Sequence, residues 1–201
     1  MDNVGVNPSA PEESWRTKRP TPCITTISTR KKRRVIVVGD SLLKETEGPI
    51  CGADPPHREV CCFPGARVRD ITRKLPSLVQ PSDCYLLLLF HVGGDKVAVH
   101  SPRVIKRDFR VLGRLVRESG AQVIFSSLLP VAGGDVARNR WTQSINTWLR
   151  GWCHRHSFGF FDNGMAYTAP DLMASDGIHL SQSGKRTFAQ ELAGLIGRTL
   201  N

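Results

Sequence analysis

The sequence predicts a three-layer, doubly wound α/β sandwich, in which helices cover both faces of a five-stranded parallel sheet. Two observations lead to this fold class. From residue 34 onward, short β-branched or apolar runs alternate with amphipathic segments of helical length, as in successive strand–helix–strand units. The most hydrophobic run, residues 84–92, shows no alternation of polar and apolar positions, as expected for a central parallel strand that is covered on both faces.

Each expected strand is a short apolar run, and the first two end at turn signals. Residues 34–38 end at Gly39, and residues 59–63 are followed by Pro64 and Gly65. The remaining strands are expected at residues 84–92, 121–129 and 158–161. Parallel strands need crossovers between them, and helices of suitable length separate the expected strands, whereas residues 44–57 are expected to be loop.

The expected helices have apolar residues spaced three and four positions apart. They are expected at residues 67–79, from about residue 105 to the stop at Gly120, through residues 141–152, and at residues 182–199. Pro76 is expected to end or bend the first of them. In the third, Trp141, Trp148 and Trp152 share one face with Ile145, and we predict that this face lies in the core.

Size and composition indicate one domain that does not span a membrane. The chain has 201 residues, 40% of them hydrophobic, and its longest apolar run is far shorter than the about 20 residues that cross a bilayer. The first 30 residues lack the apolar segment of a secretory signal, so we expect an intracellular protein, cytoplasmic or nuclear and not secreted. The six cysteines are expected to be reduced thiols, and their spacing predicts no metal site.

Residues 1–33 are predicted to be a disordered basic tail ahead of a domain at residues 34–201. Residues 1–34 carry eight Lys/Arg and three Asp/Glu, a net charge of +5, and the other 167 residues contribute the remaining +5 of the total of +10. The run Arg30-Lys31-Lys32-Arg33-Arg34 is typical of a nuclear-import signal or of a patch that binds RNA phosphates. A solvated arm that only keeps the chain soluble is the alternative. The run contains no aromatic residue, so base stacking on it is not expected.

Two short motifs near opposite ends of the domain could carry chemistry. The first expected strand leads into Gly39-Asp40-Ser41-Leu42, which places the Ser41 hydroxyl at the carboxyl edge of the sheet. A helix N-cap is the alternative role for such a serine. Near the other end, Asp176 precedes His179 by three residues, a spacing that lets the carboxylate hydrogen-bond Nδ1 and leaves Nε2 to take a proton from a serine.

Together these motifs resemble the SGNH (GDSL) esterase/lipase family, from about Val35 to the C-terminus. The nucleophile block and the closing Asp-x-x-His block match, and Pro64-Gly65-Ala66 looks like the glycine block of the family. The resemblance implies the flavodoxin-like SGNH hydrolase fold and a carboxylic-ester hydrolase for small or lipid-like esters, without a metal or an organic cofactor. It further implies roles for individual residues: Ser41 as nucleophile, His179 as general base and then acid, Asp176 as the orienting carboxylate, and the backbone N–H groups of Ser41 and Gly65 in the oxyanion hole.

The third block departs from the family pattern. Where the family has Gly-x-Asn-Asp, this chain has Gly93-Gly94-Asp95-Lys96, so Asp95 stands in the place of an asparagine that donates to the oxyanion. Loss of one such donor costs about 3 to 4 kcal/mol of transition-state stabilisation. An ionised Asp95 about 4 Å away would add repulsion of about 4 kcal/mol at an effective dielectric constant of 20. A protonated Asp95 could still donate, although a nearby Lys96 favours ionisation.

A narrower resemblance concerns the closing phrase Asp-Gly-Ile-His-Leu-x-x-x-Gly-Lys behind a basic stretch. It looks like the esterase domain in the first-open-reading-frame proteins of vertebrate LINE retrotransposons. This implies a retrotransposon-derived protein that associates with element RNA or with membranes. The rival hypothesis is therefore a catalytically weak or inactive RNA-binding or packaging protein that retains the fold. Neither the acyl group nor the oligomeric state follows from the sequence.

Overall fold

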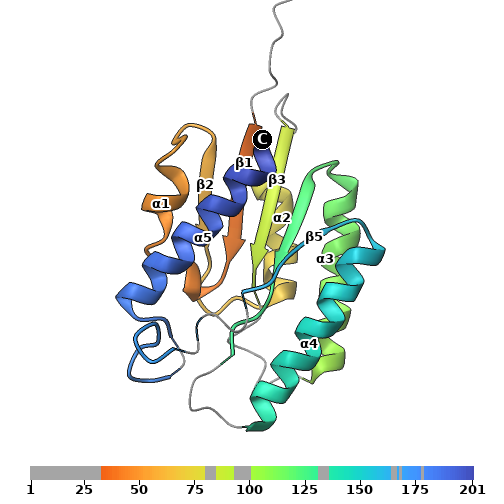
Figure 1. Cartoon of the computed structure of the whole chain (residues 1–201). Helices are drawn as coiled ribbons and strands as arrows, with labels where there is room; N and C mark the ends of the chain where they lie inside the picture. Colours follow the sequence, from red (N-terminus) through yellow and green to blue (C-terminus); the bar gives the residue numbers. More distant parts are fainter. Residues whose placement is uncertain are drawn as a thin grey trace, which may run out of the picture. The chain divides into compact units, whose positions relative to one another are not determined.

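Five parallel strands form one sheet in the order β2-β1-β3-β4-β5 (Figure 1). The computed structural model describes residues 33–79, 85–92, 101–130, 136–163, 167, 169–177 and 179–201. The strands are β1 (Arg33–Gly39), β2 (Arg58–Cys62), β3 (Tyr85–His91), β4 (Gln122–Ser126) and β5 (Gly159–Phe161). The predicted fold class is confirmed.

The apolar strand β3 lies in the middle of the sheet, as its sequence predicts. Leu87 is in register with Val35 of β1 on one side and with Gln122 of β4 on the other. Leu87, Leu88 and Leu89 are all fully buried, so side chains on both faces of the strand are covered. A strand buried on both faces needs no polar alternation, which explains the uninterrupted apolar run.

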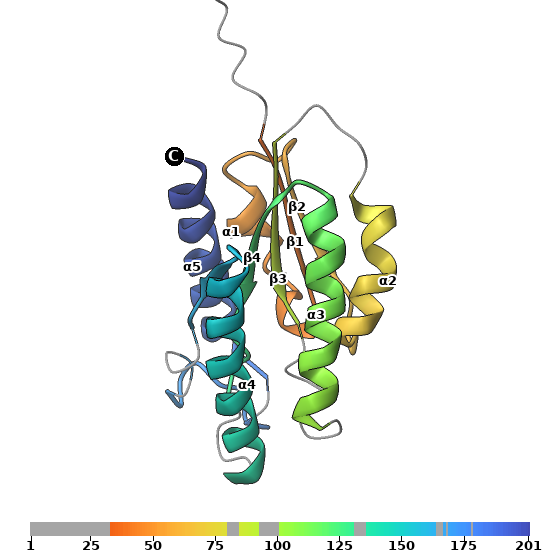
Figure 2. The same cartoon turned by 90° about the vertical axis from the view of Figure 1, so that its right-hand side faces the viewer.

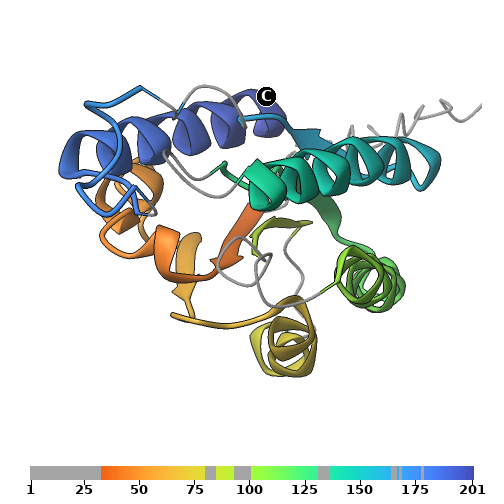
Figure 3. The same ribbon diagram turned by 90° about the horizontal axis from the view of Figure 1, so that it is seen from below.

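Helices cover both faces of this sheet. They are η1 (Ser41–Leu43), α1 (Glu47–Cys51), α2 (Val68–Leu78), α3 (Pro102–Glu118), α4 (Val136–Arg155) and α5 (Gln182–Leu200). The core on one face takes side chains from α2, α3 and α4, and the core on the other takes side chains from η1, α1 and α5. Figures 2 and 3 show α2 and α3 on one side of the sheet and α5 on the other.

Two helical segments differ from the sequence-based expectation. Helix α1 occupies a stretch expected to be loop; it has only five residues and is anchored by the fully buried Ile50. Such a short helix gives no periodic signal in the sequence. Helix α2 continues through Pro76 to Leu78, because the proline lies in its last turn, where the missing N–H removes a single hydrogen bond.

The tryptophan face of α4 is only partly in the core, which corrects the prediction. Trp152 and Ile145 are buried there, whereas Trp148 is half-buried and Trp141 is 41% exposed. The N-terminal turns of α4, which include Trp141, extend beyond the ends of the strands (Figure 1), so the sheet does not reach this part of the helix.

All described residues belong to one compact unit, and β1 begins at Arg33, the fourth residue of the basic run. Within that unit, none of the described helices is both long enough and apolar enough to cross a membrane. Arg34 lies in the sheet and pairs with Glu59 of β2, with 3.1 Å between Nη2 and Oε2. Residues 30–32 lie outside the described residues.

Candidate active site

Ser41 follows the carboxyl end of β1 as the first residue of η1. The backbone before Ser41 packs closely against β3. A Cβ on Gly39 would lie 2.1 Å from the His91 carbonyl oxygen, so a side chain does not fit there. The N–H of Asp40 donates to that same carbonyl at 3.2 Å, and the buried Asp40 carboxylate caps η1 by accepting from the N–H of Leu42 at 3.2 Å. The capping role is therefore filled by Asp40, and Ser41 lies half-buried in the turn.

The ends of β1 and β2 are tied together beside Ser41. The Phe63 N–H donates to the Gly39 carbonyl at 2.8 Å, and the Cys62 thiol donates to the Asp40 carbonyl at 3.2 Å. The next turn contains Gly65 at a φ of +70°, a conformation that L side chains rarely adopt. Gly65 thus follows the strand next to the one that leads to Ser41, where the family resemblance places an oxyanion-hole N–H.

Asp176 and His179 form the side-chain hydrogen bond that their spacing predicts. Asp176 Oδ2 lies 2.6 Å from His179 Nδ1, and Oδ1 accepts from the His179 backbone N–H at 2.9 Å. One carboxylate thus fixes both the ring and the backbone of the histidine. Nε2 is the ring nitrogen that does not contact Asp176, and both side chains are about half exposed.

The loop that carries His179 is held against the first turn of α5. The Ala174 N–H donates to the His179 carbonyl at 2.8 Å, and the Ser181 N–H donates to the Leu172 carbonyl at 2.9 Å. Ser181 also caps α5, because its hydroxyl accepts from the Gly184 N–H at 3.0 Å. A Cβ on Gly184 would lie 2.0 Å from the Leu172 carbonyl oxygen, so a side chain at this position would displace the loop.

The structure brings the Ser41 and His179 segments onto the same face of the sheet. Leu42 and Leu43 of η1 share one buried core with Leu180, the residue after His179. At the surface, Lys185 Nζ of α5 lies 2.9 Å from Glu45 Oε2, two residues after η1. This hydrogen bond and charge lower the pKa of Glu45. Helix α5 therefore holds together two motifs that lie far apart in the sequence.

A buried polar network at the carboxyl ends of β3, β4 and β5 was not found by sequence reasoning. His91 Nδ1 lies 2.9 Å from Ser126 Oγ, which accepts from Asn163 Nδ2 at 3.3 Å. Ser127 Oγ in turn accepts from the Asn163 N–H at 3.0 Å and donates to its side-chain oxygen at 2.5 Å. All four residues are buried, and burial lowers the pKa of His91 to about 4. The available signal was a polar residue at the end of two apolar strands, His91 of β3 and Ser126 of β4, and another two residues after β5.

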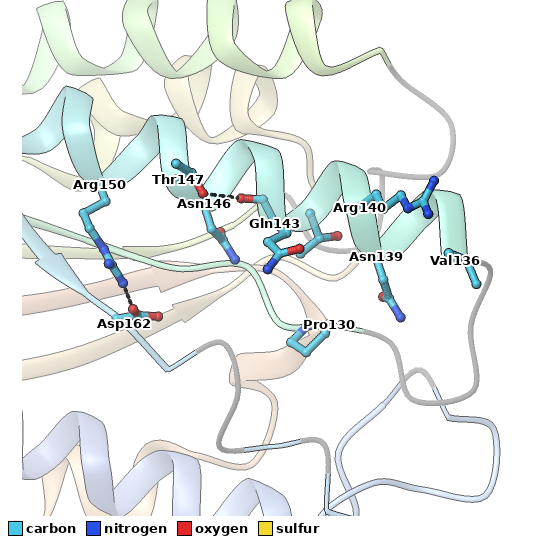
Figure 4. A pocket seen from close by; sticks show the side chains of 10 residues that line it. Pro130, Val136, Asn139, Arg140, Gln143, Asn146, Thr147, Arg150 and Asp162 are labelled. Atoms are coloured by element: carbon cyan, nitrogen blue, oxygen red, sulfur yellow. Dashed lines mark hydrogen bonds and ion pairs between the residues drawn. The ribbon is translucent and has the colours of Figure 1, made fainter.

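A pocket of about 600 Å³ lies along α4, next to the segments that follow β4 and β5 (Figure 4). Eight of its ten lining residues have polar or charged side chains; they include Gln143 and Asn146 of α4 and the ion pair between Arg150 and Asp162. Asn146 ties α4 to the end of β4, because its amide both donates to the Leu128 carbonyl and accepts from the Leu128 N–H, each at 2.8 Å. One of the lining residues thus also joins α4 to the segment that follows β4.

Four of the predicted site residues lie outside the part of the chain that the structure describes. Asp95, together with the rest of its block, lies outside the described residues, as do Arg30, Lys31 and Lys32 of the basic run. In the described part of the chain, no group of three or more His, Cys, Asp or Glu side chains could hold a metal ion.

A second Asp-x-x-His pair lies just before the amino-terminal end of β2. Asp54 Oδ1 lies 2.8 Å from His57 Nδ1, and the His57 carbonyl accepts from the Val35 N–H near the start of β1. Ser41 lies beyond the opposite end of β1. This pair is therefore separated from Ser41 by the length of the strand.

A scan against protein-family models finds no match, and a search of curated proteins finds none either. The search of solved structures gives matches throughout the domain. A candidate acylhydrolase from Bacteroides fragilis superposes with a TM-score of 0.70 at 14% identity, covering 85% of this chain and 91% of that one. A member of the lipolytic G-D-S-L family from Veillonella parvula has a TM-score of 0.69 at 14% identity, covering 82% and 97%. The chain has the SGNH hydrolase fold.

The esterase domain of a zebrafish retrotransposon first-open-reading-frame protein also matches, with 28% identity over 83% of this chain and 98% of that one. Its TM-score is 0.44, so this superposition adds nothing to the fold assignment. In the SGNH hydrolase fold of this chain, Ser41 and Gly65 follow adjacent strands, and the loop with Asp176 and His179 precedes the last helix.

Proposed function

We propose that this protein is a serine hydrolase that cleaves a small or lipid-like carboxylic ester, with Ser41, His179 and Asp176 as its catalytic residues. The observation that carries the proposal is the hydrogen bond between Asp176 and His179 Nδ1, in a loop whose Leu180 shares a core with the η1 turn of Ser41. A carboxylate on Nδ1 selects the tautomer in which Nε2 can accept a proton. Two structural neighbours, a candidate acylhydrolase and a member of the lipolytic G-D-S-L family, agree with this reaction class.

The reaction proceeds in two halves. The Ser41 hydroxyl attacks the ester carbonyl carbon while His179 Nε2 takes its proton, and Asp176 stabilises the imidazolium that forms. The tetrahedral oxyanion accepts hydrogen bonds from the backbone N–H groups of Ser41 and Gly65. The intermediate collapses as the carbon–oxygen bond to the alcohol breaks, and His179 protonates the leaving alcohol. Water then attacks the acyl-enzyme with His179 again as the base, which releases the acid and restores Ser41.

The bidentate contact of Asp176 matters for this cycle because the pair is solvent-exposed. A surface imidazole would otherwise sample several rotamers, and each misplacement of the base costs rate. Because the carboxylate holds the backbone N–H at 2.9 Å as well as Nδ1 at 2.6 Å, the ring orientation is tied to the fold of the loop.

Asp95 is proposed as an impaired third member of the oxyanion hole. Its place in the third block is that of a side-chain donor in the family, and an ionised carboxylate has no proton to donate. The proposal therefore includes a reduced rate compared with a chain that has asparagine at this position.

A fluorophosphonate activity probe tests the proposal, because it labels only a serine that its own active site activates. We expect labelling of the full chain, no labelling of Ser41→Ala, and retained labelling of Ser126→Ala, which removes a different serine that also contacts a histidine. A folded chain that the probe leaves unlabelled would contradict the proposal and favour the rival, an RNA-binding protein without turnover. Circular dichroism of each variant shows whether it is folded.

A further inference from the structure

The positive charge of the domain is concentrated on two neighbouring helices. Helices α3 and α4 together hold ten Lys/Arg and two Asp/Glu, a net charge of +8, and α4 has no acidic residue at all. The rest of residues 35–201 has a net charge of −3. The positive charge of this domain is therefore a property of α3 and α4 and not of its whole surface.

On α3 the cations share one side of the helix. At about 100° per residue, the six Lys/Arg fall within an arc of about 100°, away from the buried side chains. They are Arg103, Lys106, Arg107, Arg110, Arg114 and Arg117. Five of the six are exposed, and Lys106 is partly buried.

One aromatic side chain of α4, that of Trp148, lies against this row of cations. Arg110 Cζ is 5.1 Å and Lys106 Nζ is 5.8 Å from the centre of the Trp148 ring. Trp141 and Arg155 lie seven residues on either side of Trp148, so all three share one stripe of α4. We call the six cations of α3 together with Trp141, Trp148 and Arg155 the α3–α4 face; both helices lie at the β5 side of the sheet (Figure 1).

We propose that the α3–α4 face binds single-stranded nucleic acid, with the arginines on the phosphates and the exposed Trp141 stacked on a base. A surface of this kind combines cations that follow a phosphate backbone with aromatic rings that stack on bases. Arginine in five of six positions suits phosphates, because the guanidinium donates two parallel hydrogen bonds to them. This site is separate from the basic tail and independent of the proposed hydrolase.

The composition of the face favours nucleic acid over an anionic membrane. A helix that docks on a bilayer inserts several large apolar side chains between the headgroups. Among the described residues, the exposed large hydrophobics are Val111, Val136 and Trp141, and Trp141 alone belongs to the α3–α4 face. A single exposed ring can stack on a base, but it is too little apolar surface to anchor a helix in a bilayer.

The test measures binding of the full chain to a fluorescent 20-nucleotide oligouridine by anisotropy at several KCl concentrations. The triple variant Arg103→Gln/Arg110→Gln/Arg114→Gln should bind at least tenfold more weakly at 100 mM KCl. Its slope of log Kd against log salt should fall by about 2, since each neutralised phosphate contributes about 0.7. The matched control Arg73→Gln/Arg186→Gln/Arg198→Gln removes the same charge from α2 and α5, and its affinity should stay within threefold of the unchanged chain.

A second variant separates stacking from charge. Trp141→Ala should weaken binding by about 5- to 100-fold with an unchanged salt slope, and Trp141→Phe should restore most of the affinity. Equal losses in the two triple variants, or an α3 triple variant that binds like the unchanged chain, would overturn the proposal. So would an α3 triple variant that loses only its binding to phosphatidylserine vesicles. The urea midpoint of each variant confirms that the fold is intact.

Discussion

The structure contains the same Asp-x-x-His pair twice, at opposite ends of the sheet. Asp54 and His57 lie 2.8 Å apart, Asp176 and His179 lie 2.6 Å apart, and both contacts use Nδ1. The first pair precedes β2 and therefore lies at the amino ends of the strands, whereas the second shares a core with the turn that follows β1. The contact between the carboxylate and Nδ1 does not by itself distinguish them. Their position relative to the strand ends does, because reactive groups in open α/β sheets gather at the carboxyl ends.

A similar contrast holds for the serines. Ser126 lies 2.9 Å from His91 Nδ1, close enough for a nucleophile and its base, but both residues are buried and no substrate can reach them. Ser41 is half-buried at the edge of the sheet. The difference teaches that access, and not the serine–histidine distance alone, selects the candidate nucleophile.

Replacement of Ser41 by alanine should have the largest effect on activity, and the same replacement at Ser126 is its matched control. We expect Ser41→Ala to reduce kcat/KM on a short-chain aryl ester to background, a loss of more than about 10⁴-fold. Ser126→Ala should keep kcat/KM within about threefold and lower the urea midpoint instead, because it leaves buried partners without a hydrogen bond. Loss of activity in Ser126→Ala without loss of stability would reverse the assignment of the two serines.

The two aspartates provide the next comparison. Asp176→Asn should lower kcat by about 10⁴-fold, because an amide can donate to Nδ1 and stabilise the wrong tautomer. Asp54→Asn alters an equivalent pair at the other end of the sheet and should leave kcat unchanged. Steady-state kinetics on the same ester measures both, and a comparable loss in the two variants would remove the distinction between the pairs.

Asp95→Asn should increase activity. The substitution removes a negative charge near the developing oxyanion and supplies a donor at nearly the same volume. We expect kcat to rise about 10- to 1,000-fold, which corresponds to about 1.4 to 4 kcal/mol. If kcat/KM does not change at any pH between 5 and 9, Asp95 does not belong to the oxyanion hole.

The buried His91 should make stability depend on pH. Burial lowers its pKa to about 4 from an ordinary value of 6.5, so the unfolded chain binds more protons between these values and stability falls as the pH falls. Acidification from pH 7 to pH 5 therefore lowers the free energy of unfolding by about 2 kcal/mol. Urea denaturation at both pH values should show this loss, and His91→Gln should reduce it, whereas the exposed His154→Gln should not.

The sequence sufficed for the five strands because each is an apolar run of ordinary length with turn residues or helices between. The Asp176–His179 contact was also predictable, since it spans only three residues. The His91 network was not, because its hydrogen bonds join residues 35 and 37 positions apart, and no local pattern encodes such pairs.

The two charged regions show a further limit of sequence reasoning. The basic run at residues 30–34 is contiguous and easily seen, whereas the cations of α3 are separated by apolar residues and offset in the total by acidic residues elsewhere. Likewise, the spacing of Trp141 and Trp152 predicts that they share a face, but only the extent of the neighbouring sheet decides which of them is covered.

Gly184 has a consequence for how this gene would decay if selection were relaxed. A Cβ at this position would lie 2.0 Å from the Leu172 carbonyl oxygen, so even alanine, a change of one nucleotide from any glycine codon, would push aside the loop that presents His179. Gly39 is constrained in the same way beside Ser41. The mutational target for loss of the proposed activity thus extends beyond the catalytic residues to two glycines without reactive groups.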